Sequence, residues 1–211
     1  MSHAELDSPE PTPGGEPAAA VVRKRPKPGE RRVQILQALA TMLEQPGAER
    51  ITTAALAAKL DVSEAALYRH FASKAQMFEG LIEFIEQSVF TLINQIAERE
   101  PAGQAQAGRI VAMLIQFAEK NPGMTRVMVG DALVFENDRL QQRMNQFFDK
   151  VEASLKQCLR GTGDGATPTV DAQVQASVLT AFIVGRLQRF ARSGFKRVPS
   201  EHLEQALARM L

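Results

Sequence analysis

After residue 29, hydrophobic residues return every three or four positions along most of the chain, which is the repeat of one helix face. No segment alternates apolar and polar residues convincingly, so no strand is predicted. The fold class is therefore expected to be all-α. The pattern predicts a first helix that ends before Pro46-Gly47, two short helices between Ile51 and Ser73, and a long helix from Lys74 to Pro101. Further helices are predicted from Ile110 to Asn121, from Pro122 towards Gly130, from Leu140 to Gly161, after Pro168 and from Ser200.

The two short helices have apolar residues that can close on one small shared core. These are Leu56, Ala57 and Leu60 on the first helix and Leu67 and Phe71 on the second. Asp61 stands between the helices, where the turn needs a residue that tolerates left-handed backbone. Ser63 is placed to cap the second helix, and Glu64 is favourable in its first turn. The segment is expected to form a helix-turn-helix.

The residues outside this small core have side chains suited to a DNA groove. Ala65, Tyr68 and Arg69 are three and four positions apart, and Ala66 and His70 flank them. Alanines allow a helix to lie deep in a groove, where the larger polar side chains reach bases or phosphates. Phosphate contacts are expected from Thr52, Thr53, Tyr68, His70 and Lys74, and base-edge contacts from Ser63, Ala65, Ala66 and Arg69. Periodicity alone leaves another interpretation open, because any two amphipathic helices show such an apolar pattern.

Positive charge is concentrated just before the helix-turn-helix. Between Val21 and Arg32, only Glu30 opposes the basic residues Arg23, Lys24, Arg25, Lys27, Arg31 and Arg32. The run either meets DNA phosphates or is a solvated basic tail, and both interpretations stay open.

The composition argues against several other classes of site. The chain has 211 residues and a net charge of +1, enough length for one or two domains. Cys158 is the only cysteine, which excludes an internal disulfide or a thiolate metal cluster. His3, His70 and His202 are not spaced as metal ligands, so no bound metal is expected. The sequence shows no nucleophile–base pair and no phosphate-binding loop, so no cofactor or enzyme activity is expected. Without a secretory signal or a bilayer-spanning apolar run, the expected location is the cytoplasm.

The string from Val62 to Lys74, Val-Ser-Glu-Ala-Ala-Leu-Tyr-Arg-His-Phe-x-Ser-Lys, resembles the signature of the TetR family of transcriptional regulators. The likeness extends from about Ile51 to Phe78, and Asp61 stands where the family usually has glycine. It implies a TetR-like fold, with an N-terminal three-helix unit containing the helix-turn-helix and a C-terminal helical dimerisation domain. The expected parts are a disordered Pro/Gly-rich basic arm at 1–29, the DNA-binding domain at 30–73, and the dimerisation and partner-binding domain at 74–211.

Strings outside the helix-turn-helix resemble a narrower group within this family, the nucleoid occlusion factors. They occupy residues 78–86, 121–126, 132–141, 143–148 and 195–199, and the likeness as a whole covers roughly residues 30–199. It implies a protein, associated with the nucleoid, that binds palindromic sites on chromosomal double-stranded DNA. While bound, such a protein antagonises assembly of FtsZ, the tubulin-like GTPase of cell division, and keeps the septum off unsegregated DNA.

Phe84 is the candidate anchor for such a protein partner. The long helix is expected to turn one apolar stripe inward, made of Phe78, Leu81, Ile82, Ile85 and Val89. Phe84 lies off that stripe, where it either receives a partner peptide or packs within its own subunit. The resemblance implies a partner groove between this helix and the next, which ends at Lys120 and Asn121. A cationic edge there suits a partner tail with carboxylates or a free C-terminus.

The helices on either side of the glycine loop at 161–168 each carry more apolar surface than one neighbour covers. Phe147 and Phe148 are adjacent on the first, and Ala181 and Gly185 form a smooth patch on the second. Other apolar positions of the second helix are Val174, Val178 and Phe182. Either one core absorbs this surface or two subunits share it. Because helix-turn-helix proteins usually bind paired half-sites, and the TetR resemblance implies a four-helix dimer interface, we expect a homodimer, with several dimers possible per DNA site.

The alternative function is a small-molecule-responsive TetR-type transcriptional repressor. Such a protein needs polar groups that converge on an apolar cavity. The second half offers Asn121, Thr125, Arg126, Asp131, Asn145 and Thr180, but the sequence brings them to no common point. An enclosed cavity beneath Phe117, Met113 and Val178 would favour the repressor, and a solid interior would not.

Overall fold

The computed structural model describes residues 29–45, 50–160 and 168–211. These residues form α-helices and one short 3-10 helix and contain no strand, which confirms the predicted all-α class. The helices are α1 (Glu30–Leu43), α2 (Thr53–Lys59), α3 (Glu64–Tyr68), α4 (Lys74–Arg99), α5 (Gln104–Lys120), α6 (Pro122–Met128), α7 (Asp138–Leu159), α8 (Pro168–Arg192) and α9 (Leu203–Met210), with the 3-10 helix η1 (Asp131–Leu133) between α6 and α7. Almost all of the predicted arm and glycine loop lies outside the described residues.

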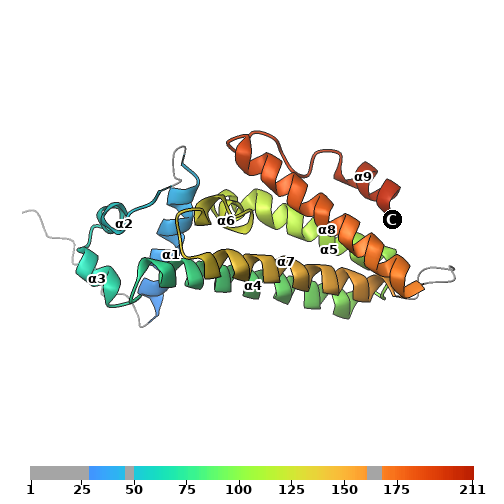
Figure 1. The fold of residues 1–211 in the computed structure, drawn as a ribbon, viewed down its shortest axis with the longest axis horizontal. Helices are drawn as coiled ribbons and strands as arrows, with labels where there is room; N and C mark the ends of the chain where they lie inside the picture. The colour runs from blue at the N-terminus through green and yellow to red at the C-terminus, as the bar shows by residue number, and fades with distance from the viewer. Residues whose placement is uncertain (1–28, 46–49, 161–167) are drawn as a thin grey trace, which may run out of the picture.

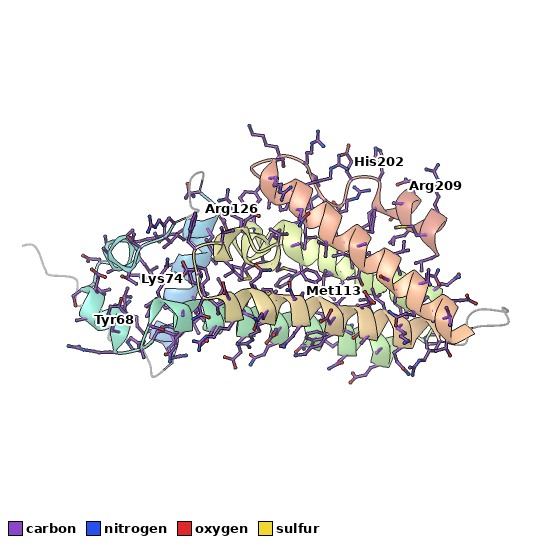
Figure 2. All side chains as sticks on the ribbon, in the orientation of Figure 1. Tyr68, Lys74, Met113, Arg126, His202 and Arg209 are labelled. Atoms are coloured by element: carbon purple, nitrogen blue, oxygen red, sulfur yellow. The ribbon has the colours of Figure 1, made fainter. Side chains whose placement is uncertain are left out.

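Four long helices, α4, α5, α7 and α8, run along the molecule, and α1–α3 gather at one end of it (Figure 1). α5 packs on the other three long helices, and α7 packs on both α4 and α8. Figure 2 shows Tyr68 at the end formed by the short helices and Met113 among the long ones. Within the described ranges, none of the helices combines the length and apolar composition that a membrane crossing requires.

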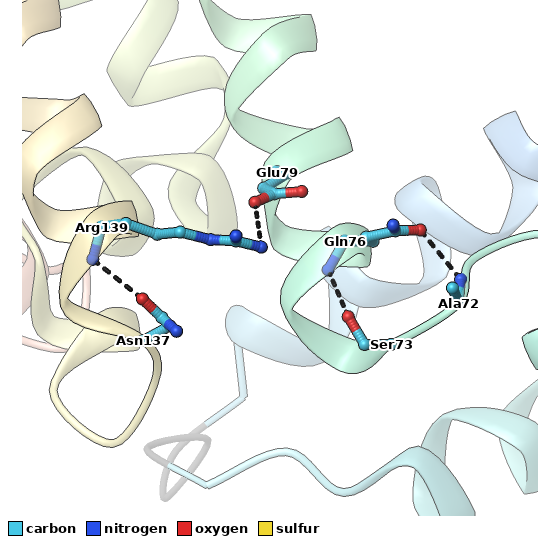
Figure 3. A network of polar contacts seen from close by, with 6 residues as sticks. All are labelled: Ala72, Ser73, Gln76, Glu79, Asn137 and Arg139. Atoms are coloured by element: carbon cyan, nitrogen blue, oxygen red, sulfur yellow. Dashed lines mark hydrogen bonds and ion pairs between the residues drawn. The ribbon is translucent and has the colours of Figure 1, made fainter.

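α4 begins where the sequence supplies a reciprocal cap. The Ser73 Oγ accepts a hydrogen bond from the Gln76 backbone N–H at 3.2 Å, and Gln76 Oε1 accepts one from the Ala72 N–H at 2.9 Å (Figure 3). Both bonds satisfy backbone donors at the start of the helix. The expected stripe of α4 is buried, since Phe78, Leu81, Ile82, Ile85 and Val89 are each at most 2% exposed. The helix therefore runs from the short helices directly into the core of the long ones.

Three ion pairs join α4 to the beginning of α7 and the loop before it. They are Lys74–Glu136, Glu79–Arg139 and Glu86–Arg143, and we call them the ion-pair ladder. Figure 3 shows the middle pair, with 2.5 Å between Glu79 Oε1 and Arg139 Nη2. Beside it, Asn137 Oδ1 caps α7 by accepting from the Arg139 N–H. Hydrogen bonding to Glu86 raises the pKa of Arg143 above its ordinary value.

α6 approaches α1 so closely that position 123 has no space for a side chain. A Cβ added to Gly123 would lie 1.9 Å from the backbone oxygen of Ala40. α1 also packs on α2 and α4, so it stands between α6 and the short helices. The contact of Gly123 with Ala40 therefore joins the long-helix bundle to the end that carries α2 and α3.

The two helices beside the predicted glycine loop differ in how much apolar surface they expose. Phe147 of α7 is fully buried, and Phe148 packs edge-to-face on it with ring centres 5.1 Å apart. Because α4, α5 and α8 of the same chain all pack on α7, this helix shows no exposed large apolar residue, so its surface is absorbed by one core, the first of the two interpretations left open. On α8, Val174 and Val178 are 58% and 51% exposed. The surface available to a second subunit thus lies on α8.

Candidate nucleic-acid interface

α2 and α3 form the predicted helix-turn-helix. Asp61 has a φ of 53°, the left-handed conformation predicted for the turn. The Ser63 Oγ accepts from the Ala66 N–H at 3.3 Å and caps α3, and the Thr52 Oγ1 accepts from the Ala55 N–H at 3.1 Å and caps α2. The shared core includes Leu56, Leu67 and Phe71, each 1% exposed. Capping and burial together hold the two helices in a defined relative orientation.

The end of α3 differs from the prediction at Arg69. The helix ends at Tyr68, and Arg69 is its C-terminal cap, with φ −70° and ψ −23°. The backbone N–H groups of His70 and Phe71 both donate to the Leu67 carbonyl oxygen, which closes the last turn. Arg69 therefore keeps helical backbone angles, while His70 lies beyond the helix.

Arg32 of α1 holds this end of α3. Its Nη1 donates a hydrogen bond to the His70 carbonyl oxygen, and its guanidinium carbon lies 4.1 Å from the centre of the Phe71 ring. Arg32 belongs to the basic run, for which a phosphate contact and a solvated tail are the two expectations. It instead makes a contact within the chain that sequence reasoning missed, because His70 lies 38 positions away. The basic residues before Gly29 lie outside the described residues.

The predicted DNA contacts lie around α3, with α2 beside it. Exposed residues of this set are Thr52, Ser63, Ala65, Tyr68, Arg69 and His70, whereas Thr53, Ala66 and Lys74 are half-buried. The Tyr68 hydroxyl donates to Thr53 Oγ1 at 3.4 Å, and Thr53 Oγ1 donates to Glu64 Oε2 at 2.6 Å. Two of the hydroxyls expected at phosphates thus lie side by side on neighbouring helices.

Lys74, at the start of α4, already has a carboxylate partner. Its ammonium pairs with Glu136 and lies 5.7 Å from the centre of the Phe78 ring. The Lys74 side chain is 28% exposed and that of Glu136 only 10%. Sequence reasoning missed Glu136, because this residue lies 62 positions from Lys74 in a loop with no local sign of a partner.

The candidate partner residues lie on the α4–α5 helical hairpin. Phe84 of α4 is 47% exposed, which favours an outward role over packing within the subunit. α4 ends at Arg99 and α5 begins at Gln104, so equal counts from the loop bring Phe84 level with Glu119, the residue before Lys120. Lys120 is exposed, whereas the Asn121 side-chain amide donates to the Phe117 carbonyl oxygen at 2.7 Å. The Asn121 amide is therefore hydrogen-bonded to the last turn of α5.

The residues expected around a ligand cavity do not enclose one. Val178 is exposed, while Met113 and Phe117 pack against the core, so the three do not line a common enclosed space. A cleft of about 400 Å³ lies instead at the surface between α8 and the segment before α9. Its lining includes Ala181, Gly185, Arg186, Arg189, Arg197 and His202.

The two buried hydroxyls among the groups proposed for a ligand site donate to backbone carbonyl oxygens of the long-helix bundle. The Thr125 hydroxyl donates to the Ala118 carbonyl oxygen at 2.7 Å, and the Thr180 hydroxyl donates to that of Ala176 at 2.9 Å. Arg126 lies over the Phe195 ring, with 5.2 Å between its guanidinium carbon and the ring centre. These groups do not converge on a cavity, which weakens the ligand-responsive alternative.

Two family matches divide the chain. Residues 35–81 match the bacterial regulatory proteins of the tetR family. Residues 104–210 match the SlmA-like type of the tetracyclin repressor-like C-terminal domain. The first match contains the helix-turn-helix described above, and the second contains α5–α9.

Similarity to individual proteins extends over most of the chain. The nucleoid occlusion factor SlmA of Idiomarina loihiensis is 52% identical over 174 residues, which are 82% of this chain and 89% of that protein. SlmA of Vibrio cholerae is 50% identical over 83% of this chain and 91% of its own length. Among solved structures, a TetR transcriptional regulator from Legionella pneumophila has a TM-score of 0.68 over 90% of this chain and 100% of its own, at 13% identity. The last likeness shows a shared fold.

Proposed function

This chain belongs to the nucleoid occlusion factor SlmA family of TetR-type DNA-binding regulators, and we propose that it binds palindromic chromosomal sites as a homodimer and, while bound, inhibits assembly of FtsZ. In this way it keeps the septum off the nucleoid with which it associates. The observation that carries the proposal is the identity of about half of the residues to SlmA proteins, over more than four fifths of the chain. This identity extends far beyond the helix-turn-helix.

The exposure of α3 supports insertion of this helix into the major groove. Ala65 and the half-buried Ala66 let the backbone approach the bases, and Ser63 and Arg69 reach base edges. The phosphate contacts in this proposal are Thr52, Thr53, Tyr68, His70 and Lys74. Since phosphate contacts carry no sequence information and base contacts do, the two sets predict different mutant behaviour.

Replacing Tyr68 with alanine is expected to weaken binding to every duplex, because a phosphate contact is common to all of them. Replacing Arg69 with alanine is expected chiefly to reduce discrimination between cognate and unrelated duplexes, by about 1–3 kcal/mol. Anisotropy titrations against a selected palindrome and a mixed-sequence duplex measure both effects. Arg160→Ala is the control, since Arg160 is the exposed C-cap residue of α7. This end of α7 lies away from α1–α3 (Figure 1). Unchanged binding of both duplexes by both variants would contradict the assignment.

An exposed apolar stripe on α8 supports the homodimer. We define the α8 stripe as Val170, Val174, Val178, Ala181 and Gly185. Its members are three or four positions apart and share one helix face. A Cβ added to Gly185 would meet nothing within 4 Å, so this end of the stripe is open to a neighbouring helix. Two copies related by a twofold axis bury the stripe of each against the other.

The exposed ring of Phe84 supports the FtsZ surface, with the exposed Lys120 within one residue of the same level on α5. In this proposal the ring anchors an apolar residue of the FtsZ tail. Lys120 attracts carboxylates of the tail, and Asn121 borders the groove. DNA binding raises the affinity for FtsZ by a coupling of about 1–3 kcal/mol.

Phe84→Ala is expected to reduce the inhibition of FtsZ assembly at least about tenfold, the loss typical of an aromatic anchor, with duplex binding unchanged. Phe135→Ala is the matched control, because Phe135 is 68% exposed but lies in the loop before α7. The measurement is the amount of polymer sedimented at increasing concentrations of each variant, in the presence of duplex. An equal loss for both variants, or none for Phe84→Ala, counts against the proposed surface.

The function as a whole is tested by sedimentation of polymerising FtsZ with this protein, with and without its cognate duplex. We expect less polymer with the protein than without it, and a further decrease when the duplex is added. Equal amounts of polymer under all conditions would refute the division role. Duplex binding that a small molecule reverses would then support the ligand-responsive repressor.

A further inference from the structure

The first pair of the ion-pair ladder differs from the other two in the direction of its charges. In the second and third pairs, α4 contributes the acids Glu79 and Glu86. In the first pair α4 contributes the base, Lys74, and the acid is Glu136 of the loop between η1 and α7. Lys74 directly follows Ser73, the cap that joins the helix-turn-helix to α4. The ladder thus ends in a cation beside the DNA-binding end of the molecule.

The two members of this first pair differ in how firmly they are held. Glu136 is 10% exposed in its side chain, and its backbone N–H donates to the Leu133 carbonyl oxygen at 3.0 Å. The next residue, Asn137, caps α7, which fixes the other side of the loop. Lys74 is more exposed and carries its ammonium on a flexible four-carbon stem. Lys74 can therefore change partner by rotating its side chain, whereas Glu136 is held in place by its loop.

We propose that Glu136 competes with a DNA phosphate for Lys74 and thereby sets the affinity and the salt dependence of duplex binding. This inference rests on the proposed DNA-binding function and names a residue that acts on that site through another, so Glu136 is a positioning residue. To reach a phosphate, Lys74 must leave Glu136. The half-buried carboxylate then loses its partner and lies near the negatively charged duplex, and both effects oppose binding.

The test replaces Glu136 with glutamine, which keeps the size of the side chain and removes its charge. Binding to a mixed-sequence duplex and to a selected palindrome is measured between about 50 and 200 mM salt. We expect affinity to rise about two- to fivefold at the lowest salt, the range of one partly exposed ion pair. The slope of log K against log salt is expected to steepen by up to about one unit, because Lys74 then neutralises a phosphate without a competing carboxylate. The gain should be equal on the two duplexes, since a phosphate contact carries no sequence information.

Two further variants separate competition from a change in net charge or in folding. Glu79→Gln removes one negative charge from the neighbouring pair, whose base, Arg139, lies on α7, and it should raise affinity less than Glu136→Gln. Lys74→Gln should remove the gain, so that adding Glu136→Gln to Lys74→Gln changes affinity little. Thermal unfolding of each variant checks that the fold is kept. Lys74→Gln removes the charge of the other member of the Lys74–Glu136 pair.

The outcomes separate this inference from the proposed function. A wild-type protein that binds neither duplex at low salt refutes DNA binding itself. If the wild type binds, an equal gain from Glu79→Gln and Glu136→Gln overturns the competition, because net charge alone then accounts for the gain. Weaker binding by Glu136→Gln also overturns it, because the carboxylate would then orient Lys74 towards the phosphate.

Discussion

Val178→Asp is expected to convert the dimer into monomers and to weaken binding to a palindromic duplex by about 100-fold or more. The α8 stripe, of which Val178 is the centre, faces solvent in the single chain, so the substitution leaves the fold intact. In a twofold interface each substitution occurs twice, and burying a carboxylate without a partner costs several kcal/mol. Loss of the dimer then removes the gain from binding two half-sites together, which is about 100- to 10,000-fold.

Sedimentation equilibrium gives the mass of the variant, and a duplex titration gives its affinity. Val134→Asp is the control for oligomeric state, because Val134 is 70% exposed but lies outside α8. We expect this control to sediment as a dimer. A dimeric Val178→Asp protein with unchanged affinity would show that the α8 stripe is not the interface.

Gly123→Ala is expected to destabilise the protein by about 1–3 kcal/mol or more, because the added carbon collides with a backbone atom rather than a movable side chain. The Cβ would lie 1.9 Å from the Ala40 oxygen, so α6 and α1 must separate. For a chain of this length the corresponding fall in melting temperature is roughly 2–12 °C. Since α1 also packs on α2 and α4, duplex binding should weaken as well.

Gly108→Ala is the matched control for this substitution. Gly108 lies inside α5, and a Cβ added to it would meet only the end of the Leu211 side chain, at 3.1 Å. Alanine is favoured over glycine inside a helix by about 1 kcal/mol, so this variant should melt at the same temperature or higher. Calorimetry compares the two variants, and equal losses would mean that the close approach of α6 to α1 is not the cause.

Much of the DNA-binding motif could be predicted because its determinants are local. Asp61 adopts the left-handed turn, and Ser63 caps α3 within three residues of itself. The stripe of α4 follows from helical spacing, and Phe84 lies outside that stripe in both sequence and structure. Each of these features depends on residues a few positions apart, whose relation is set once the helix forms.

The contacts that modify this motif could not be predicted in the same way. In the sequence, Arg32 is one of several basic residues in a run. No neighbouring residue in the sequence identifies the His70 carbonyl oxygen as its hydrogen-bond acceptor. Lys74 has the expected position at the start of α4, but its pairing with Glu136 appears only after α7 packs against that helix. Such pairs depend on how whole helices are placed relative to each other.

Helical periods and turn residues were sufficient to derive an all-α chain, the order of its helices and a helix-turn-helix, since backbone preferences act over one or two turns. An apolar face indicates that a helix packs against another element, but it does not identify that element. Packing therefore decided that α7 is covered by its own chain, that α8 keeps an exposed apolar face, and that Gly123 must lack a side chain. Those outcomes depend on contacts between segments distant in sequence, where burial and steric fit act together.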